Sequence, residues 1–393
     1  MDKNEMADSS KNKIEKMVQK KYGKKRTNEA FVYAKRIKSI LEKMVVEGIG
    51  DASIKASILK IIDKRPEILM VQFGNQRCNL GMIAADLKAE WFVLKALEYK
   101  EPSLQQDYKD QNIGMHAAQA RLKLATLKAL DNMDASVQQD CIGENIGMYA
   151  ASAQLEEATL KALDNKQASV QQNINGYNIG MFAIVAHLEK ATLKALDNAE
   201  ASVQQNVRGM NLGMIAAMEG LEQATLKALD NKEASVQQDD CGRNIGIFAA
   251  KHYFKQATLK ALDNTEASVQ QDNWGLNIGM YAAICGLEEA TIKALDNAEA
   301  SIQQDASGFN IGMLAAKKGL EKAALKAIEI PVARSQKNDS QETIVAIAQE
   351  MGLTRVEKAY DELAKNKASK KNKNNSAEQH DLSLDEIEKQ LGL

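Results

Sequence analysis

The chain has 393 residues, of which 45% are hydrophobic and 26% are charged, and its formal net charge is −2. Such a chain can bury apolar surface, and its near-neutral charge argues against a protein that binds nucleic acid by electrostatics alone. Aromatic residues make up only 5% and there are three prolines, which favours helices over a sandwich or barrel with many turns.

The cysteines and the apolar segments indicate in which cellular compartment the chain is found. The four cysteines lie far apart, with no spacing typical of a zinc site or a small disulfide framework: Cys78, Cys141, Cys241 and Cys285. A reducing compartment is therefore expected. No apolar run approaches the roughly 18–20 residues of a membrane-spanning helix, and the first residues lack the apolar stretch of a secretory signal. We expect a soluble cytoplasmic protein without a transmembrane segment.

The first 78 residues divide into two parts. Residues 1–29 are predicted to be a polar, basic tail, in which "KKYGKKR" (Lys20 to Arg26) is either a solvated helix edge, the interpretation we prefer, or a nuclear-import or membrane-surface patch. Residues 30–78 are predicted to form a helical cap. Their segment "SIKASILKIIDK" resembles "EEATLKALDNKQ" in the middle of the chain, where similar words recur, so we interpret it as a divergent half-repeat.

A short word, "NIGM" or a close variant, recurs along the middle of the chain. It begins every 33 residues, at Asn79, Asn112, Asn145, Asn178, Asn211, Asn244, Asn277 and Asn310. A fixed period in this range is typical of stacked supersecondary units, because one unit cannot bury its apolar face alone. Residues 79–332 are therefore predicted to be repeats of helix-turn-helix type.

The unit from Asn211 to Arg243 shows the expected elements. Asn211 suits the N-cap of a first short helix, and Gly220 suits a turn with positive φ. A second helix follows, with one apolar stripe at Leu221, Ala224, Thr225 and Ala228. Asn231 is predicted to be a left-handed C-terminal stop, and residues 232–243 an extended connection with a tight turn at Gly242.

The C-terminal part is predicted to close the array. Thr343 lies 33 residues after Asn310, and residues 333–363 still suggest two helices, so we predict a capping repeat there. Residues 364–380 have the low complexity of a disordered linker. In residues 381–393, Ser383 and Glu386 form a capping-box pattern that predicts a short terminal helix or motif.

Two segments, "DDCGRNIGIFAA" (Asp239 to Ala250) and "DNWGLNIGMYAAICG" (Asp272 to Gly286), resemble the ankyrin repeat. That family's unit has 33 residues: an Asp-x-x-Gly hairpin turn, a helix with Ala-Ala, a glycine turn and a second helix. The resemblance covers about two thirds of the chain and implies an all-α solenoid with helical caps. The chain departs from the family in having Asn-Ile-Gly-Met where Thr-Pro-Leu-His is usual. A glycine in a first helical turn should cost about 1 kcal/mol relative to alanine.

Sequence variation concentrates at the hairpin tips and at the end of the first helix, whereas the framework words barely change. In the ankyrin family these positions line the tips and the inner, concave face, so the resemblance implies a protein-binding surface from about Tyr108 to Lys318. Large apolar groups on exposed turns are typical of interface anchors, although each could instead pack against a neighbouring tip. The candidate partner-binding residues are Tyr108, Ile142, Tyr177, Arg208, Met210, Arg243, Lys251, His252, Trp274, Leu276, Phe309 and Lys317.

No pattern in the sequence indicates catalysis or metal binding. The four histidines, His116, His187, His252 and His380, do not form an i, i+4 pair, and His116 and His252 are expected to be surface residues or hydrogen-bonded within the fold. No base accompanies a nucleophilic cysteine. The recurring Asp-Asn pairs are interpreted as helix caps, and the paired glutamines as hydrogen bonds along stacked connections. We therefore expect no enzyme, no cofactor, no metal and no small-molecule substrate.

The sequence thus predicts a monomeric, non-catalytic scaffold that binds a partner protein. An alternative is a secreted bacterial effector that targets a host protein, because an acidic, leucine-containing C-terminus such as residues 381–393 resembles a type IV translocation signal. Binding of nucleic acid through the basic tails is a third, less favoured hypothesis, because the repeats are near neutral.

Overall fold

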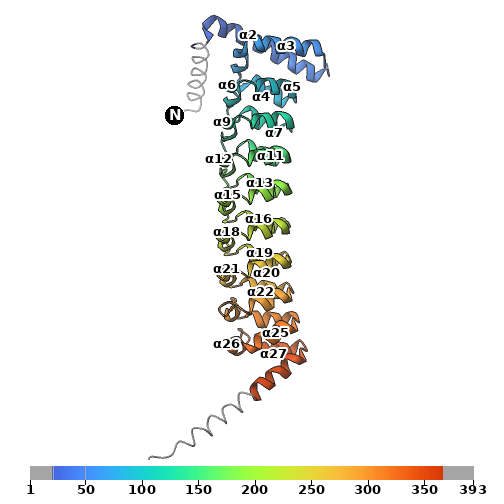
Figure 1. Cartoon of the computed structure of the whole chain (residues 1–393), viewed down its shortest axis with the longest axis vertical. Helices are drawn as coiled ribbons and strands as arrows, with labels where there is room; N and C mark the ends of the chain where they lie inside the picture. The colour runs from blue at the N-terminus through green and yellow to red at the C-terminus, as the bar shows by residue number, and fades with distance from the viewer. Residues whose placement is uncertain (1–19, 21, 49, 366–393) are drawn as a thin grey trace, which may run out of the picture. The chain divides into compact units, whose positions relative to one another are not determined.

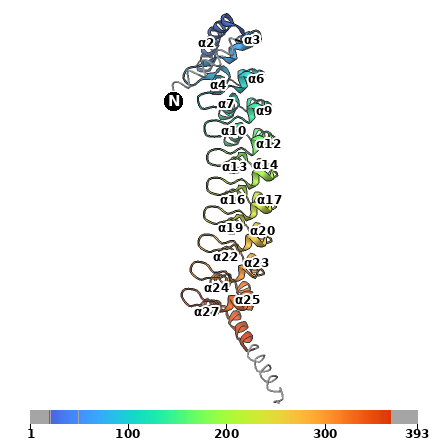
Figure 2. The same cartoon turned by 90° about the vertical axis from the view of Figure 1, so that its left-hand side faces the viewer.

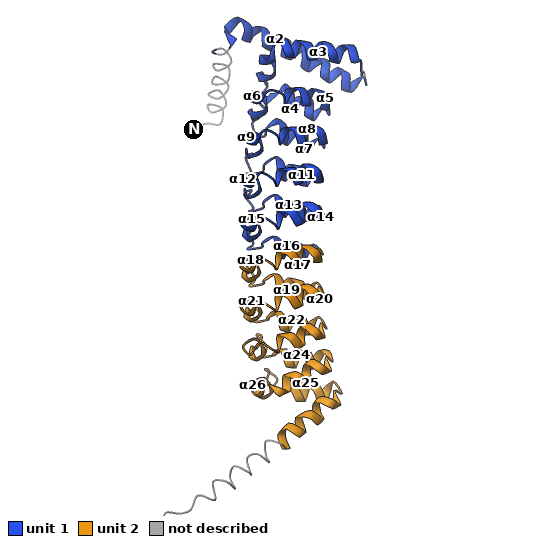
Figure 3. Ribbon diagram, in the orientation of Figure 1, with its two compact units in different colours: residues 1–219 blue, residues 220–393 orange. Residues whose placement is uncertain are grey.

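The computed structural model describes residues 20, 22–48 and 50–365. The chain forms two compact units, residues 1–219 and residues 220–393 (Figure 3), and each is considered by itself. The predictions for residues 381–393, for most of the linker at 364–380, for His380 and for part of the basic patch at Lys20 to Arg26 lie outside the described residues.

The first unit opens with two helices and a small hairpin. The elements are α2 (Lys24–Val46), α3 (Ala52–Lys64), the 3-10 helix η1 (Pro66–Met70), β1 (Gln72–Phe73) and β2 (Cys78–Asn79). The two strands are antiparallel, with Gln72 opposite Asn79. Helix α2 begins inside the segment predicted to be a polar tail, and it buries Ala30, Ala34, Ile37 and Leu41, one face at helical spacing.

The rest of the first unit consists of repeats with two helices of seven residues and a shorter third helix, and it ends with the first helix of a further repeat. They are α4 (Leu80–Asp86), α5 (Glu90–Ala96) and α6 (Lys100–Leu104); α7 (Ile113–Gln119), α8 (Lys123–Ala129) and α9 (Met133–Ser136); α10 (Ile146–Ser152), α11 (Glu156–Ala162) and α12 (Lys166–Ser169); α13 (Ile179–Val185), α14 (Glu189–Ala195) and α15 (Ala199–Val203); and α16 (Leu212–Met218).

The second unit continues the same pattern and ends with α27 and a further helical segment. Its elements are α17 (Glu222–Ala228) and α18 (Lys232–Val236); α19 (Ile245–Lys251), α20 (Lys255–Ala261) and α21 (Thr265–Val269); α22 (Ile278–Ile284), α23 (Glu288–Ala294) and the 3-10 helix η2 (Ala300–Ile302); α24 (Ile311–Lys318), α25 (Glu321–Glu329) and α26 (Pro331–Ser335); and α27 (Ile344–Glu350), after which residues 354–365 are helical.

These elements confirm the predicted fold class. Within each unit the helix pairs pack sequentially, pair against pair, as a helical solenoid (Figures 1 and 2). Asn211 caps its helix as predicted, accepting from Met214 N at 3.0 Å, and Gly220 has a φ of 82°.

One local prediction was wrong. Asn231 is not a left-handed stop, because its φ is −85° and its side chain accepts from Glu233 N and Ala234 N at 3.1 and 3.2 Å, so it caps α18. The connection from 232 to 243 is therefore helical in its first part. A turn of helix with its own cap satisfies backbone groups that an extended strand would leave open.

The glycine of the repeated word allows successive repeats to approach closely. A Cβ on Gly81 would lie 2.5 Å from Ile113 Cδ1 of the next repeat and 3.1 Å from Ala96 Cβ. A Cβ on Gly180 would lie 2.7 Å from both Leu212 Cδ2 and Ala195 Cβ. Packing therefore outweighs the poor helix propensity of glycine at this position.

The asparagine of the same word is the centre of a buried hydrogen-bond network. Asn145, fully buried, accepts from Met148 N at 3.1 Å and donates to Ala168 O at 3.0 Å and Gln171 Oε1 at 2.9 Å. Gln171 in turn donates to Val137 O of the preceding repeat at 2.8 Å.

The second glutamine of each pair extends this network to the following repeat. Gln172 donates to Gly176 O at 2.6 Å and to Gln205 O of the next repeat at 3.0 Å. Both glutamines therefore hydrogen-bond along the stack, which confirms the sequence-based interpretation.

Adding a methyl group at Gly81 tests the close approach. Because overpacking by a Cβ 2.5 Å from Ile113 Cδ1 should cost toward the upper end of about 1–3 kcal/mol and alanine gains about 1 kcal/mol of helix propensity, Gly81→Ala should lower the free energy of unfolding by about 1–2 kcal/mol, measured by urea denaturation. Gly50→Ala is the control, since that glycine has open space around its Cα and no positive φ. Adding Ile113→Val, which removes the clashing Cδ1, should show a favourable coupling of at least about 0.5 kcal/mol. Unchanged stability of Gly81→Ala would contradict this account.

Replacing Asn145 by alanine tests the buried network. The change leaves Met148 N, Ala168 O and Gln171 Oε1 without their partner, and unmet buried polar groups cost about 1–3 kcal/mol each. We expect a loss of about 3 kcal/mol or more in the same titration. Asn175→Ala, at an exposed hairpin tip, should change stability by no more than about 0.5 kcal/mol; equal effects of the two substitutions would refute the assignment.

Candidate functional site

The variable residues of each repeat are carried by a tight hairpin turn. In one turn, the Asp140 carboxylate accepts from Ile142 N at 3.0 Å and from Glu144 N at 2.8 Å, and Asp140 N donates to Glu144 O at 2.9 Å. Gly143 has a φ of 83°, and a Cβ there would lie 2.9 Å from Asn173 Cα of the next repeat. Only glycine satisfies both conditions.

Successive turns are tied together by their backbones. Within the first unit the turns project from the same side of the repeats (Figure 2). The hydrogen bonds between neighbouring tips of this unit are Tyr108 N to Gln76 O (2.9 Å), Cys141 N to Lys109 O (2.8 Å), Ile174 N to Ile142 O (2.9 Å) and Val207 N to Asn175 O (3.0 Å). Within the second unit they are Asn273 N to Cys241 O (2.9 Å), Ala306 N to Trp274 O (2.9 Å) and Asp339 N to Ser307 O (3.1 Å). Each unit therefore presents its tip residues on a fixed backbone.

Large apolar side chains are exposed on this backbone. In the first unit Ile174 is 67% and Val207 is 65% exposed, and in the second unit Trp274 is 53% exposed. The C-terminal ends of the first helices add the exposed side chains Val185, Met218 and Ile284. We call the tips together with these helix ends the variable surface of each unit.

The predicted site residues fall into three groups by exposure. Exposed are Tyr108, Ile142, Arg208, His252, Trp274 and Lys317; partly buried are Tyr177, Arg243, Lys251, Leu276 and Phe309; buried is Met210. The sequence analysis placed Ile174, Val207, Val185, Met218 and Ile284 at the variable tips and helix ends but did not include them among the candidate binding residues.

The expectation that the residue after the turn glycine is exposed was wrong for Met210, which is only 5% exposed. At this position the chain returns toward its own first helix. The Tyr177 ring packs edge-on against Phe182, with centroids 5.9 Å apart, and the Phe309 ring lies under Lys317 Nζ at 4.8 Å. Tyr177 and Phe309 thus pack against the first helix of their own repeat, whereas the alternative interpretation had each tip residue pack against a neighbouring tip.

In several repeats a polar pair joins the turn to the first helix that follows it. Tyr149 donates to Asp140 Oδ2 at 2.8 Å, and burial, together with this bond, raises the pKa of Tyr149. Tyr281 and Asp272 repeat the pair at 2.6 Å. Where the helix residue is Phe182, the turn residue is Asn173 instead of aspartate. The substitution avoids an unpaired buried carboxylate.

In one repeat the helix residue is a histidine. His116 is buried, with Nδ1 2.8 Å from Asp86 Oδ1 and Nε2 3.3 Å from Asp107 Oδ2. Burial opposes its charge, but the hydrogen bonds and charges of the two aspartates outweigh this and raise the pKa of His116 to about 9. Of the two environments expected for His116, the structure shows the hydrogen-bonded one. Burial and the nearby carboxylates raise the pKa of Cys78, beside this pair, to about 12.

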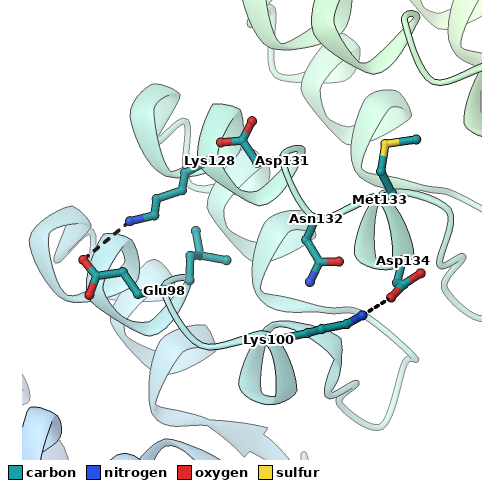
Figure 4. Close-up of a pocket in the computed structure, with 8 residues that line it drawn as sticks. Glu98, Lys100, Lys128, Asp131, Asn132, Met133 and Asp134 are labelled. Carbon is teal, nitrogen blue, oxygen red and sulfur yellow. Dashed lines mark ion pairs between the residues drawn. The ribbon is translucent and has the colours of Figure 1, made fainter.

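Two hollows between neighbouring repeats are large enough to hold a small ligand. One of about 420 Å³ lies beside α6 and α9, where Lys128 faces Glu98 at 3.6 Å and Lys100 faces Asp134 at 2.6 Å (Figure 4). The other, of about 650 Å³, is lined at Leu262, Lys293 and Asn297, the positions equivalent to Leu97, Lys128 and Asn132 five repeats earlier. A hollow that recurs with the repeat follows from the stacking geometry and is not a dedicated site.

No family model matches this chain, and no curated protein matches its sequence. In the described part of the chain, no helix has both the length and the apolar character needed to span a membrane. The structure therefore establishes a solenoid of 33-residue helical repeats.

The pairing of turn and helix residues can be tested by exchange. Tyr149→Phe leaves the Asp140 carboxylate with one partner fewer, so we expect the free energy of unfolding to fall by about 1–2 kcal/mol. Adding Asp140→Asn should recover at least half of the loss, since it creates the Asn-Phe combination of the next repeat, where Asn173 donates to Glu144. The measurement is a double-mutant cycle in urea, and strictly additive losses would argue against the pairing.

Proposed function

We propose that the chain is a non-catalytic scaffold that binds a partner protein through the variable surface. The observation that carries the proposal is the recurrence of exposed apolar side chains, above all Ile174, Val207 and Trp274, on hairpins whose backbones are hydrogen-bonded to neighbouring hairpins of the same unit. Contiguous exposed apolar groups are typical of protein interaction sites, and tryptophan is enriched among interface anchors.

The rigidity of the hairpins supports this proposal. A loop that must become ordered on binding loses part of the binding free energy to that ordering. Here the turn of Asp140 is held by its own side chain, by Gly143 and by the neighbouring tips, so little ordering remains to be done on binding.

The recurring polar residues serve the framework, which supports a role without catalysis. Asp230 accepts from Lys260 Nζ at 2.6 Å, the same Lys260 donates to Leu226 O at 2.8 Å, and Asn231 caps α18. The four cysteines are free thiols, in keeping with a reducing compartment such as the cytoplasm. We further propose that the chain acts as a monomer.

We also propose that the repeats are divergent ankyrin repeats. The 33-residue period, the Asp-x-x-Gly turn with a positive-φ glycine and the two following helices support this relationship. The chain departs from the ankyrin repeat in its third short helix and in its Asn-Ile-Gly-Met word. The close contact at Gly81 explains the glycine of that word by packing.

A matched pair of triple variants tests the binding surface. The tip variant combines Ile174→Ser, Val207→Ser and Trp274→Ser; the control combines Leu124→Ser, Met133→Ser and Val332→Ser, which are similarly exposed apolar residues on second and third helices. Proteins that co-purify with the wild-type chain are quantified with both variants. The partner is the protein that the tip variant loses and the control retains.

The affinity for that purified partner should fall by more than about 30-fold in the tip variant, the equivalent of one lost interface anchor of about 2 kcal/mol. Circular dichroism should show the same helicity for both variants. A tip variant that keeps every partner, or a control that loses the same proteins, would rule out this surface.

A further inference from the structure

Three metal-ligating side chains from separate segments meet inside the first unit. Cys78 comes from β2, Asp107 from a hairpin turn and His116 from α7. Their ligand atoms all lie within 4.8 Å of one another, and each side chain is more than nine-tenths buried. These residues are not part of the variable surface, so any role they have is independent of the proposed function.

This combination is special to one place in the repeat array. One repeat later, the equivalent positions hold Gln111, Asp140 and Tyr149, which form a hydrogen-bonded chain: Gln111 donates to Tyr149 Oη at 2.5 Å, and Tyr149 donates to Asp140 at 2.8 Å. Where the next repeat has Gln111 and Tyr149, this site has Cys78 and His116. Both substitutions replace a residue that only hydrogen-bonds by one that also ligates metal ions.

We propose that Cys78, Asp107 and His116 bind one zinc ion. Thiolate, imidazole and carboxylate are the ligand types of protein zinc sites, and three protein ligands leave the fourth tetrahedral position for water. The mixture of sulfur and nitrogen donors favours zinc over magnesium or calcium, which prefer oxygen ligands only.

The surrounding hydrogen bonds assign the ligand atoms. Lys109 N and Gln111 N occupy Asp107 Oδ1 at 2.7 and 2.9 Å, which leaves Oδ2 facing His116 Nε2. His116 Nδ1 lies 2.8 Å from Asp86 Oδ1. A carboxylate on the outer nitrogen of a metal-binding histidine fixes the ring orientation and increases its basicity, so Asp86 is a positioning residue.

Charge and protons balance in this site. Zinc carries two positive charges, which the Cys78 thiolate and the Asp107 carboxylate neutralise. As the metal bonds form, the thiol proton and any proton on His116 Nε2 pass to solvent. The ion would join the segment before α4 to the turn before α7, and thus two successive repeats of the first unit.

The test uses the full chain, freed of metal with a chelator and then titrated with Zn²⁺ and, as a spectroscopic probe, with Co²⁺. We expect one tightly bound ion per chain and, with Co²⁺, the near-ultraviolet absorption of a thiolate-to-cobalt charge transfer. Cys78→Ser should abolish that absorption. His116→Tyr should weaken Zn²⁺ binding by more than about 100-fold, beyond the loss typical of second-sphere changes.

His116→Tyr is designed to fold, because it creates the Asp-Tyr pair that Asp140 and Tyr149 form one repeat later. Cys141→Ser and His187→Ala, at exposed positions, are the controls and should leave both signals unchanged. Asp86→Asn should lower the affinity by about 10–100-fold.

Three outcomes overturn the proposal. They are the absence of a thiolate-to-cobalt band in the wild-type chain, Zn²⁺ affinity in His116→Tyr equal to that of the wild type, and loss of the band in Cys141→Ser instead of Cys78→Ser. The first outcome is measured on the wild-type chain, so it tests the zinc proposal even if a variant fails to fold.

Discussion

The close approach of one repeat's isoleucine, or leucine, to the glycine of the preceding repeat is the contact on which the solenoid depends. Helices of seven residues are too short to be stable alone, so their stability must come from packing against neighbours. The missing Cβ of Gly81 leaves the space that the Ile113 and Ala96 side chains occupy, since an added Cβ would lie 2.5 Å from Ile113 Cδ1 and 3.1 Å from Ala96 Cβ. At that separation Gln171 and Gln172 donate to backbone carbonyls of the adjacent repeats, and the buried Asn145 holds Gln171 from within its own repeat. The constant 33-residue interval is a consequence, because an inserted residue would take these partners out of reach.

Different residues of the repeat provide stability and recognition. Framework side chains such as Asn145 and Gln171 form their hydrogen bonds inside the stack. The exposed Lys161–Asp131 ion pair is reinforced by a bond from Lys161 Nζ to Leu127 O at 2.8 Å. The tip residues Ile174 and Val207 contribute their backbones to the row and leave their side chains in solvent. Such side chains can change from repeat to repeat at little cost to the fold.

The polar positions beneath the turns show that the framework itself varies by paired substitutions. Tyrosine on the helix accompanies aspartate in the turn, and phenylalanine at Phe182 accompanies asparagine at Asn173. At Asp239 the helix residue is Phe248, and the carboxylate is instead paired with Arg243 Nη2 at 2.6 Å. In every one of these repeats the buried turn residue finds a partner suited to its charge. His116 between two aspartates is a further version of this pairing, and the cysteine beside it adds a third kind of metal ligand.

The sequence by itself determined the period, the first two helices of each repeat, the asparagine caps and the turn glycines, because these depend on local propensity and strict repetition. The short third helix escaped prediction, since four or five residues are too few to show a helical period. Only the tertiary structure decided that Met210 turns inward while Ile174 and Val207 point outward, because that depends on how each turn meets its first helix. Stacking also brings Cys78, Asp107 and His116 together, since residues in adjacent repeats become neighbours only when the repeats pack against each other.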